Sequence, residues 1–269
     1  MSKVVLITGC STGIGRDLAM QLANSGYTVV ATARKVETMD DLKVALKLPL
    51  DVTRSDTIHE AIGQVIQRCG RIDVLVNNAG YAVRGAVEEV PVDKAQQMFD
   101  ANLFGVMRMV QVVVPHMRRQ KAGRIINISS VVGKLVTPAN GTYSASKFAL
   151  EGLSDAMRLE LAPFGIQVVL VEPGSTKTQF HATVEANAEE IFANPASPYR
   201  PLYDQYQKVT AGMRRQEAGP EAVSQVIQQT IEASRPKARY VAGFPFSGRL
   251  VLFLGNSVWD RVVRQLFKI

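Results

Sequence analysis

The sequence predicts an α/β fold of three layers, in which one doubly wound parallel sheet is covered by helices on both faces. Short apolar, β-branched runs without a polar face alternate with longer segments of helical periodicity, and the connections are short. Strands buried on both sides of a parallel sheet have this pattern, and repeated β–α units imply right-handed crossovers. The 269 residues, 46% of them hydrophobic, can bury one core and contain no repeat or linker, so we expect a single domain, 1–269.

The expected strands and helices follow one another along the chain. Strands are expected at Lys3–Thr8, Thr28–Ala33, Ala45–Leu50, Ile72–Val76, Arg124–Ser129 and Gln167–Glu172. Helices are expected between the first two strands up to Gly26, at Ser55–Cys69 with Ser55 as its cap, around Val92–Arg119, and at Thr142–Ala162 before Pro163 and Gly165. The motifs described below fall at the carboxyl ends of strands or on the helices beside them, where such sheets bind ligands.

The first strand runs directly into the glycine-rich segment Gly9-Cys-Ser-Thr-Gly13-Ile-Gly15. Glycines allow a tight turn and a close approach of the backbone to a ligand, and the helix that follows directs free N–H groups and its positive dipole end at an anion. The spacing differs from the commoner G-x-G-x-x-G, and an ordinary glycine-rich connection is the alternative. The order of strand, glycines and helix favours a phosphate-binding site.

Tyr143 and Lys147 are four residues apart on an expected helix, so their side chains lie on the same face. A free phenol titrates near pH ~10 and a neighbouring cation favours the phenolate, so we expect Lys147 to lower the pKa of Tyr143. Such a phenol can exchange a proton with an alcohol or carbonyl oxygen. The spacing alone is also common on solvated helix faces, and it is the other motifs that favour catalysis.

Composition argues against several other classes of protein. The basic residues behind the net charge of +7 are spread out without a basic stripe, so we expect no nucleic-acid partner. His59, His116 and His181 are scattered along the chain, so we expect no metal site. A Ser-His-Asp hydrolase is also poorly supported by the sequence. No apolar stretch is long enough to span a membrane. An immediate first strand leaves no room for a signal peptide, and Cys10 and Cys69 form no disulfide framework, so we expect a cytoplasmic protein.

Taken in order, these and further motifs resemble those of the short-chain dehydrogenase/reductase family, in its compact single-domain branch. They are Thr8-Gly-x-x-x-Gly13-x-Gly15, Asp51-Val52, Asn77-Asn-Ala-Gly80, Asn102, Ile128-Ser-Ser130, Tyr143-x-x-x-Lys147 and Pro173-Gly174. They span roughly the first two-thirds of the chain, and the tail beyond about Gln179 carries no such signature. The resemblance implies a Rossmann fold and hydride transfer between a nicotinamide cofactor and a carbonyl/alcohol pair.

The resemblance also assigns catalytic roles. It implies that Tyr143 is the general acid of reduction and the general base of oxidation, and that Lys147 lowers its pKa and holds the nicotinamide ribose. Ser130, thirteen residues before Tyr143, is implied to hydrogen-bond the substrate oxygen. Its neighbour Ser129 should point to the other face of the strand, because adjacent side chains alternate. Asn102 is implied to complete a water-linked proton path to Lys147, a role compatible with a buried Asn bonded to backbone.

A larger set of residues is implied to hold the cofactor. It comprises Gly9, Ser11, Thr12, Gly13, Ile14, Gly15, Asn78, Ala79, Gly80, Pro173, Gly174, Thr176 and Thr178, together with Tyr143 and Lys147. Asp51 and Val52 are implied to lie near the adenine ring, and an Asx-turn is the alternative for Asp51. We favour a structural role for Asn77, as a tie between strands.

The end of the second strand, Thr32-Ala33-Arg34-Lys35, predicts the choice of cofactor. An NAD-selective site carries an acidic residue there for the ribose 2′-hydroxyl, whereas an Arg accommodates a 2′-phosphate. Ala33 takes the acidic position, and Arg34 can hold a phosphate through two N–H bonds. A solvated loop cation is the alternative for Arg34. The missing acid favours NADP(H).

We therefore expect an NADP(H)-dependent oxidoreductase that interconverts a ketone or aldehyde with an alcohol and reduces a hydrophobic carbonyl compound. The alternatives are an NAD-preferring alcohol or hydroxysteroid dehydrogenase and a non-catalytic nucleotide-sensing protein on the same fold. The complete set of Tyr143, Lys147 and Ser130 argues against the second. The segments Ile7–Ser11 and Ala31–Arg34 are similar to those of steroid-, retinoid- and acyl-ketone-reducing members.

Two segments near the end of the chain carry further expectations. Residues from about 179 to 219 are rich in aromatic and apolar side chains and are expected to form a flap over a hydrophobic substrate. Residues from about 244 to 269 are apolar and basic, and we favour docking on the domain or a subunit contact over a membrane surface. The family commonly pairs its two long helices, so the resemblance implies a homodimer or homotetramer.

Overall fold

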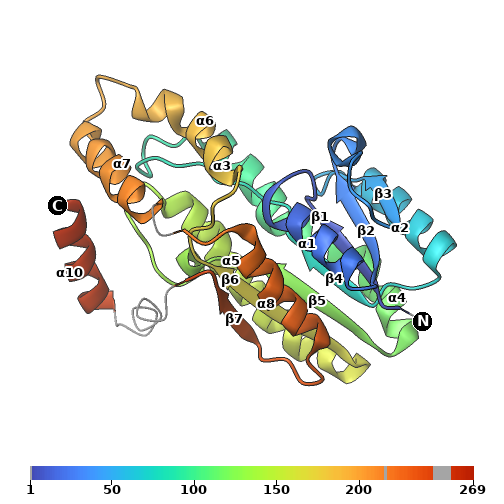
Figure 1. The fold of residues 1–269 in the computed structure, drawn as a ribbon. Coiled ribbons are helices and arrows are strands. Elements are labelled where there is room, and N and C mark those ends of the chain that lie inside the picture. The colour runs from blue at the N-terminus through green and yellow to red at the C-terminus, as the bar shows by residue number, and fades with distance from the viewer. Residues whose placement is uncertain (1, 215–216, 245–255) are drawn as a thin grey trace.

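The computed structural model describes residues 2–214, 217–244 and 256–269. Within them, seven strands form one sheet in the order β3-β2-β1-β4-β5-β6-β7 (Figure 1). The strands are β1 Val4–Thr8, β2 Thr28–Ala33, β3 Leu46–Pro49, β4 Val74–Asn77, β5 Gly123–Ile128, β6 Ile166–Pro173 and β7 Arg239–Ala242. Each neighbouring pair is parallel. The chain winds from β1 to one edge and then from β4 to the other, which confirms the predicted doubly wound sheet.

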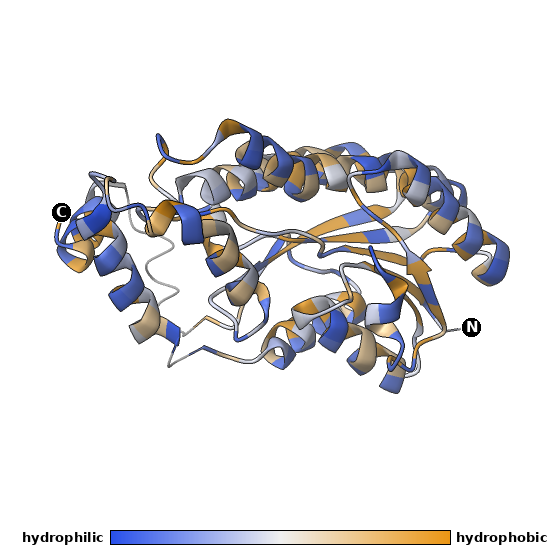
Figure 2. Ribbon diagram, turned by 90° about the horizontal axis from the view of Figure 1, so that it is seen from above, coloured by the Kyte–Doolittle hydropathy of each residue, from blue (hydrophilic) through white to orange (hydrophobic). Residues whose placement is uncertain are grey.

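Helices cover both faces of the sheet and complete the three layers (Figure 2). On one face pack α2 (Ser55–Cys69), α4 (Gly105–Gln120) and α5 (Gly141–Leu161). On the other pack α1 (Gly13–Asn24) and α8 (Pro220–Glu232). Strand β1 contributes alternate residues to the two cores, because successive side chains of a strand point to opposite faces. Burial on both sides explains why its sequence is continuously apolar.

A third apolar cluster lies beyond the carboxyl ends of the strands. It joins Ala82 and Val83, from the loop after β4, to α6 (Phe180–Phe192), α7 (Arg200–Arg214) and α10 (Asn256–Phe267). Tyr143 also belongs to this cluster. The apolar, aromatic character of residues 179–219 is thus used in packing at the end of the sheet where the motifs lie.

Helix α10 packs beside α7 (Figure 1). The rings of Tyr206 and Phe267 stack with centroids 6.2 Å apart, and Trp259 Nε1 donates a hydrogen bond of 2.8 Å to the carbonyl oxygen of Val136. Residues 245–255 of the segment expected to dock lie outside the described part of the chain. None of the helices described is both long enough and apolar enough to cross a bilayer.

Some local features differ from the sequence expectations. Ser55 is the first residue of α2 and not its cap, which is Arg54, and no side chain caps the helix. The Thr57 hydroxyl instead donates to the carbonyl oxygens of Asp51 and Arg54 and so satisfies groups of this turn. The expected helix around residues 92–119 is divided into α3 (Val92–Phe99), a π-helical turn and α4. The sequence patterns did not predict β7.

Candidate active site

Tyr143 and Ser130 meet at the carboxyl end of β5. Tyr143 lies in the first turn of α5 and is 8% exposed. Ser130 precedes the short helical turn Val131–Gly133, where its Oγ accepts a hydrogen bond from the Val132 N–H at 3.3 Å. Ser130 Oγ donates to the carbonyl oxygen of Pro173 at 3.3 Å, and Ser130 also acts to lower the pKa of the Tyr143 phenol. The structure therefore brings together the two side chains that the sequence analysis assigned to the substrate oxygen.

The acidity of Tyr143 differs from expectation. Burial raises the pKa of Tyr143 to about 12, and the positive charge of Arg84 and the hydrogen bond from Ser130 lower it only in part. The expected net lowering of this pKa is therefore not found, and the influence of Lys147 on it stays a prediction. The loss of hydration on burial outweighs nearby charge, and the cation that acts on the phenol is Arg84.

Lys147 lies one turn after Tyr143 and is buried as well. Its Nζ is 5.8 Å from the centroid of the Tyr143 ring and donates a hydrogen bond of 2.8 Å to the carbonyl oxygen of Ile128. Burial lowers the pKa of Lys147 to about 8, against the opposing effect of the carboxylate of Glu151. The two side chains share one face of α5 as predicted, but the ammonium is bonded to the end of β5.

Asn102 lies in the π-helical turn Asp100–Phe104 and is buried. Its Nδ2 donates to the carbonyl oxygen of Tyr81 at 2.9 Å and to Ser146 Oγ at 3.1 Å, while its Oδ1 accepts from the Tyr81 N–H at 3.0 Å. The Asn102 side chain thus links the loop after β4 to α5, where its partner Ser146 directly precedes Lys147. Single π-helical turns are frequent at functional sites, and no sequence pattern indicated this one.

The glycine turn fits a phosphate group. Helix α1 begins at Gly13, where φ is +61°, and its N-terminus has no side-chain cap and no acidic residue in its first turn. Its first N–H groups are therefore left for an anion, with Ser11 in the turn, Thr12 at the cap position and Ile14 in the first turn. This is the arrangement predicted for the cofactor phosphates.

Gly9 and Gly15 are required by close packing against the end of β4. A Cβ on Gly9 would lie 2.9 Å from Ala79 Cα, and one on Gly15 would lie 2.4 Å from Asn78 Nδ2. Asn78 Nδ2 donates to the carbonyl oxygens of Thr8 and Gly9 at 2.9 and 3.1 Å. These contacts hold the turns after β1 and β4 together at the point where the strand order reverses, which is where doubly wound folds bind their ligands.

The other residues expected at the cofactor line the same edge of the sheet. Gly80 packs on Asn102, with Oδ1 only 2.7 Å from where a Cβ would stand. Arg34 is exposed at the end of β2 and makes no ion pair among the described residues. Its positive charge acts to lower the pKa of the Tyr81 phenol. Val52 follows β3 and is nearly buried.

Asp51 makes the Asx-turn that was its alternative role, and Asn77 has the structural role that we favoured. Asp51 Oδ1 accepts hydrogen bonds from the N–H and the hydroxyl of Thr53 at 2.9 and 2.8 Å, as in an Asx-turn. Asn77 Nδ2 donates to Asn127 Oδ1 at 2.8 Å and ties β4 to β5. The carboxylate of Asp51 is therefore engaged locally.

The segment after β6 closes the opposite side of the glycine turn. Pro173 ends β6, Gly174 follows it, and the hydroxyl of Thr176 donates to the carbonyl oxygen of Gly174 at 3.1 Å. Thr178 Cβ is 3.3 Å from where a Cβ of Gly13 would stand. The residues expected around the cofactor thus form one continuous rim.

Arg84 is the residue at this site that the sequence analysis missed. It lies in the loop after β4, and its charge reaches Tyr143 and His181. A single basic residue within the apolar run Tyr81-Ala-Val-Arg-Gly-Ala-Val87 was the available signal.

The chain belongs to the short-chain dehydrogenase/reductase family. The model of the short chain dehydrogenase family matches residues 3–189, more than half of the chain. The 3-ketodihydrosphingosine reductase of Bacteroides thetaiotaomicron is 36% identical over 269 residues, with 99% of this chain and 97% of the relative covered. Human retinol dehydrogenase 8 is 36% identical over 282 residues, with 99% and 90% covered. Human 17-beta-hydroxysteroid dehydrogenase type 1 is 36% identical over 252 residues, with 88% and 76% covered. The expected similarity to steroid and retinoid enzymes is confirmed.

Solved structures have the same fold. A short-chain dehydrogenase from Streptomyces avermitilis superimposes with a TM-score of 0.76 at 32% identity, covering 98% of both chains. A short chain dehydrogenase/reductase from Burkholderia phymatum in complex with NAD has a TM-score of 0.79 at 25% identity, covering 97% of this chain and 95% of its own. A metagenomic short-chain oxidoreductase in complex with NADP has a TM-score of 0.70 at 26% identity, covering 90% and 97%. Proteins of this fold therefore bind either nicotinamide dinucleotide.

Proposed function

We propose that this protein is an NADP(H)-dependent reductase of lipophilic ketones or aldehydes. The observation that carries the proposal is the grouping of Ser130, Tyr143 and Lys147 at the carboxyl end of the sheet, with Lys147 buried on the same helix face as Tyr143. A protein that only senses a nucleotide needs no such group of proton donors.

The residues of the chain would act on the carbonyl oxygen of the substrate. When bound, the nicotinamide supplies the hydride. Ser130 and Tyr143 donate hydrogen bonds to the oxygen as it gains negative charge, and Tyr143 transfers its proton. The raised pKa of Tyr143 keeps the phenol protonated at neutral pH, which suits it to reduction. Lys147 and Asn102 support the return of a proton to Tyr143.

The choice of NADP(H) rests on Arg34. The described residues place no carboxylate at the end of β2, since Ala33 is followed by the exposed and unpaired Arg34. The glycine turn from Gly9 to Gly15 would hold the diphosphate, and the turn from Asn78 to Gly80, with Thr176 and Thr178, would line the ribose and nicotinamide. A guanidinium can bind a 2′-phosphate through two N–H bonds.

The substrate class rests on the apolar cluster around Tyr143. Phe180 lies against the catalytic ring with centroids 5.9 Å apart, and Val184, Ile191 and Tyr206 belong to the same cluster. The three relatives named above take their names from a ketosphingoid, a retinoid and a steroid, all of them lipophilic. A lipophilic carbonyl compound is therefore the proposed substrate.

We further propose that the protein is a homodimer or homotetramer. Large apolar side chains are exposed on α4 and α5, among them Met107 (37%), Phe148 (44%) and Leu159 (67%). Light scattering after size-exclusion chromatography measures the mass directly, and a monomer at micromolar concentration would contradict this.

The experiment that tests the activity is the loss of NADPH absorbance with a panel of lipophilic ketones and aldehydes, repeated with NADH. Turnover that is faster with NADPH and abolished by Tyr143→Phe supports the proposal. Turnover that prefers NADH rejects the cofactor choice. Binding of NADPH without reduction of any carbonyl compound would favour the nucleotide-sensing alternative.

A further inference from the structure

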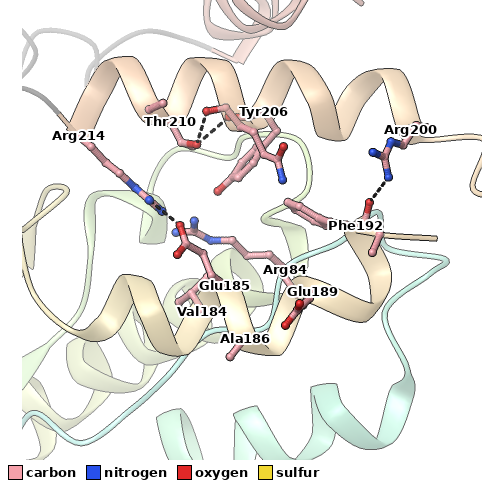
Figure 3. Close-up of a pocket in the computed structure, with 14 residues that line it drawn as sticks. Arg84, Val184, Glu185, Ala186, Glu189, Phe192, Arg200, Tyr206, Thr210 and Arg214 are labelled. Carbon is pink, nitrogen blue, oxygen red and sulfur yellow. Dashed lines mark hydrogen bonds and ion pairs between the residues drawn. The ribbon is translucent and has the colours of Figure 1, made fainter. Parts of the chain in front are cut away.

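A cavity of about 700 Å³ lies between α6 and α7 (Figure 3). Its lining includes Val184, Phe192, Tyr206 and Thr210 on the two helices, and the cations Arg84 and Arg214. Tyr143 does not line the cavity, but it shares the third apolar cluster with Val184 and Tyr206. The cavity therefore adjoins the proposed catalytic residues without containing them, and it is large enough for part of a small-molecule ligand.

Arg84 extends from the loop after β4 into the space between the two helices (Figure 3). Its guanidinium carbon is 5.5 Å from the centroid of the Tyr206 ring. Its Nε is buried and has no hydrogen-bond partner within the described chain. A buried donor without a partner costs free energy, so a ligand that accepts its hydrogen bond would be bound favourably.

The other cations of the cavity already have partners. Arg214 forms an ion pair of 2.5 Å with Glu185. Arg200 donates to the carbonyl oxygen of Phe192 at 2.8 Å and pairs with Asp204 at 3.4 Å. Arg84 takes part in none of the ion pairs among the described residues, and the Glu185 carboxylate toward which it extends is held by Arg214. Glu189, also in the lining, is exposed, so water screens its charge.

The charge of Arg84 also acts on Tyr143. Its positive charge is the strongest of the influences that lower the pKa of the phenol, and it acts on Tyr206 and His181 as well. Such effects fall off with distance, so guanidinium and phenol belong to one electrostatic neighbourhood. Two side chains of the third cluster that also line the cavity, Val184 and Tyr206, are apolar or aromatic.

We propose that Arg84 binds a carboxylate at the end of the substrate remote from its carbonyl group, while the apolar walls hold the hydrocarbon between the two. The planar guanidinium matches a carboxylate with two parallel N–H bonds, and its partly buried setting strengthens them. The substrate class is thus a lipophilic keto acid. The assignment of the carbonyl end of this substrate rests on the proposed reductase function. The assignment of its carboxylate end rests on the cavity alone.

The test compares medium-chain keto acids, with the ketone next to the far terminal methyl group, with their methyl esters. Steady-state kinetics with NADPH are measured for the wild type, Arg84→Gln and Arg84→Lys over several chain lengths. We expect the wild type to prefer the acids, most strongly at one chain length. Arg84→Gln should lose about tenfold or more of kcat/KM on the acids relative to the esters, mainly through KM, so the acid-to-ester ratio falls. Arg84→Lys should recover part of the loss, and Arg200→Gln, whose arginine is bonded to the Phe192 carbonyl and to Asp204, should keep the preference.

A binding measurement separates this inference from the proposed function. Calorimetry with decanoate, which has no ketone, should show at least tenfold weaker binding to Arg84→Gln than to the wild type, with both proteins folded by circular dichroism. If decanoate binding depends on Arg84 but no ketone is reduced, the proposed function fails and the carboxylate site stands. If ketones are reduced but the acid-to-ester ratio and decanoate binding are the same in Arg84→Gln, the inference is overturned and the reductase remains.

Discussion

The Nζ of Lys147 donates a hydrogen bond of 2.8 Å to the carbonyl oxygen of Ile128, the last residue of β5. The ammonium is thereby bonded to the end of the sheet and not to the phenol of Tyr143, whose ring centroid is 5.8 Å away. Burial is the main influence on both groups, since it raises the pKa of Tyr143 to about 12 and lowers that of Lys147 to about 8. Burial therefore favours the neutral form of both side chains. The first two predictions below follow from these two pKa shifts.

Replacing Lys147 with Met should change how stability depends on pH. The pKa of Lys147 is about 8 in the folded protein against an ordinary value of 10.5. Between these values the unfolded chain binds a proton that the folded protein has released, so this lysine makes the free energy of unfolding rise with pH. Below pH 8 the folded protein keeps a buried cation, a cost that Lys147→Met removes. We expect the stability of the variant relative to the wild type to fall from pH 7 to pH 10.

Urea unfolding followed by circular dichroism at several pH values measures this difference. Lys208→Met is the matched control, because Lys208 is exposed on α7 and its replacement removes no buried charge. A difference between Lys147→Met and the wild type that stays constant or grows with pH would contradict the prediction.

The raised pKa of Tyr143 should separate the pH profiles of the two directions of reaction. Reduction uses the protonated phenol, so its kcat/KM should be level from pH 6 to 8. Oxidation uses the phenolate, which is scarce below a pKa of about 12, so its kcat/KM should rise with pH over the same range. Initial rates in both directions test this, and an oxidation profile with its maximum below pH 8 would argue against it.

Tyr143→Phe should remove the proton donor and leave the cofactor site in place. We expect kcat to fall by ~10²–10⁴-fold, as is typical when a positioned acid is lost, while NADPH binds as in the wild type. Fluorescence titration with NADPH and steady-state kinetics measure the two effects. Tyr240→Phe, on β7 away from the site, is the control and should keep full activity. Unchanged turnover in Tyr143→Phe would reject the assignment.

Arg34→Asp should move the cofactor preference from NADP(H) to NAD(H). The substitution removes the cation that would bind the 2′-phosphate and places a carboxylate where an NAD site has one. We expect the ratio of kcat/KM for NADPH over NADH to fall by about 100-fold or more, from the lost charged hydrogen bonds and the added repulsion. Arg68→Asp, exposed on α2, makes the same change of charge elsewhere and should leave the ratio unaltered. Equal ratios in wild type and Arg34→Asp would exclude this role.

The fold could be predicted because the signals for it are local. The strand Thr28–Ala33 agrees with its prediction at both ends, since a β-branched run follows the left-handed Gly26. The glycine turn likewise followed from its place between a strand and a helix. Ser55 was assigned wrongly because two residues near it could begin the helix, and the hydrogen bonds of Thr57 with the preceding turn decide between them.

The electrostatics of the site could not be predicted in the same way, because they depend on residues far apart in the chain. The spacing of Tyr143 and Lys147 gave their shared helix face, but the burial of Tyr143 comes from residues such as Phe180, on a helix that no motif marks. Arg84 reaches the phenol from the loop after β4, about sixty residues earlier. Sequence spacing carries no information on how much water such a packing excludes.

Trp259 is the only tryptophan of the chain, and its indole is fixed to the carbonyl oxygen of Val136, in the connection that leads from Ser130 to Tyr143. The protein therefore contains its own optical reporter of the contact between the C-terminal helix and the catalytic segment. An emission spectrum recorded without any label will report whether that helix stays in place as ligands are added.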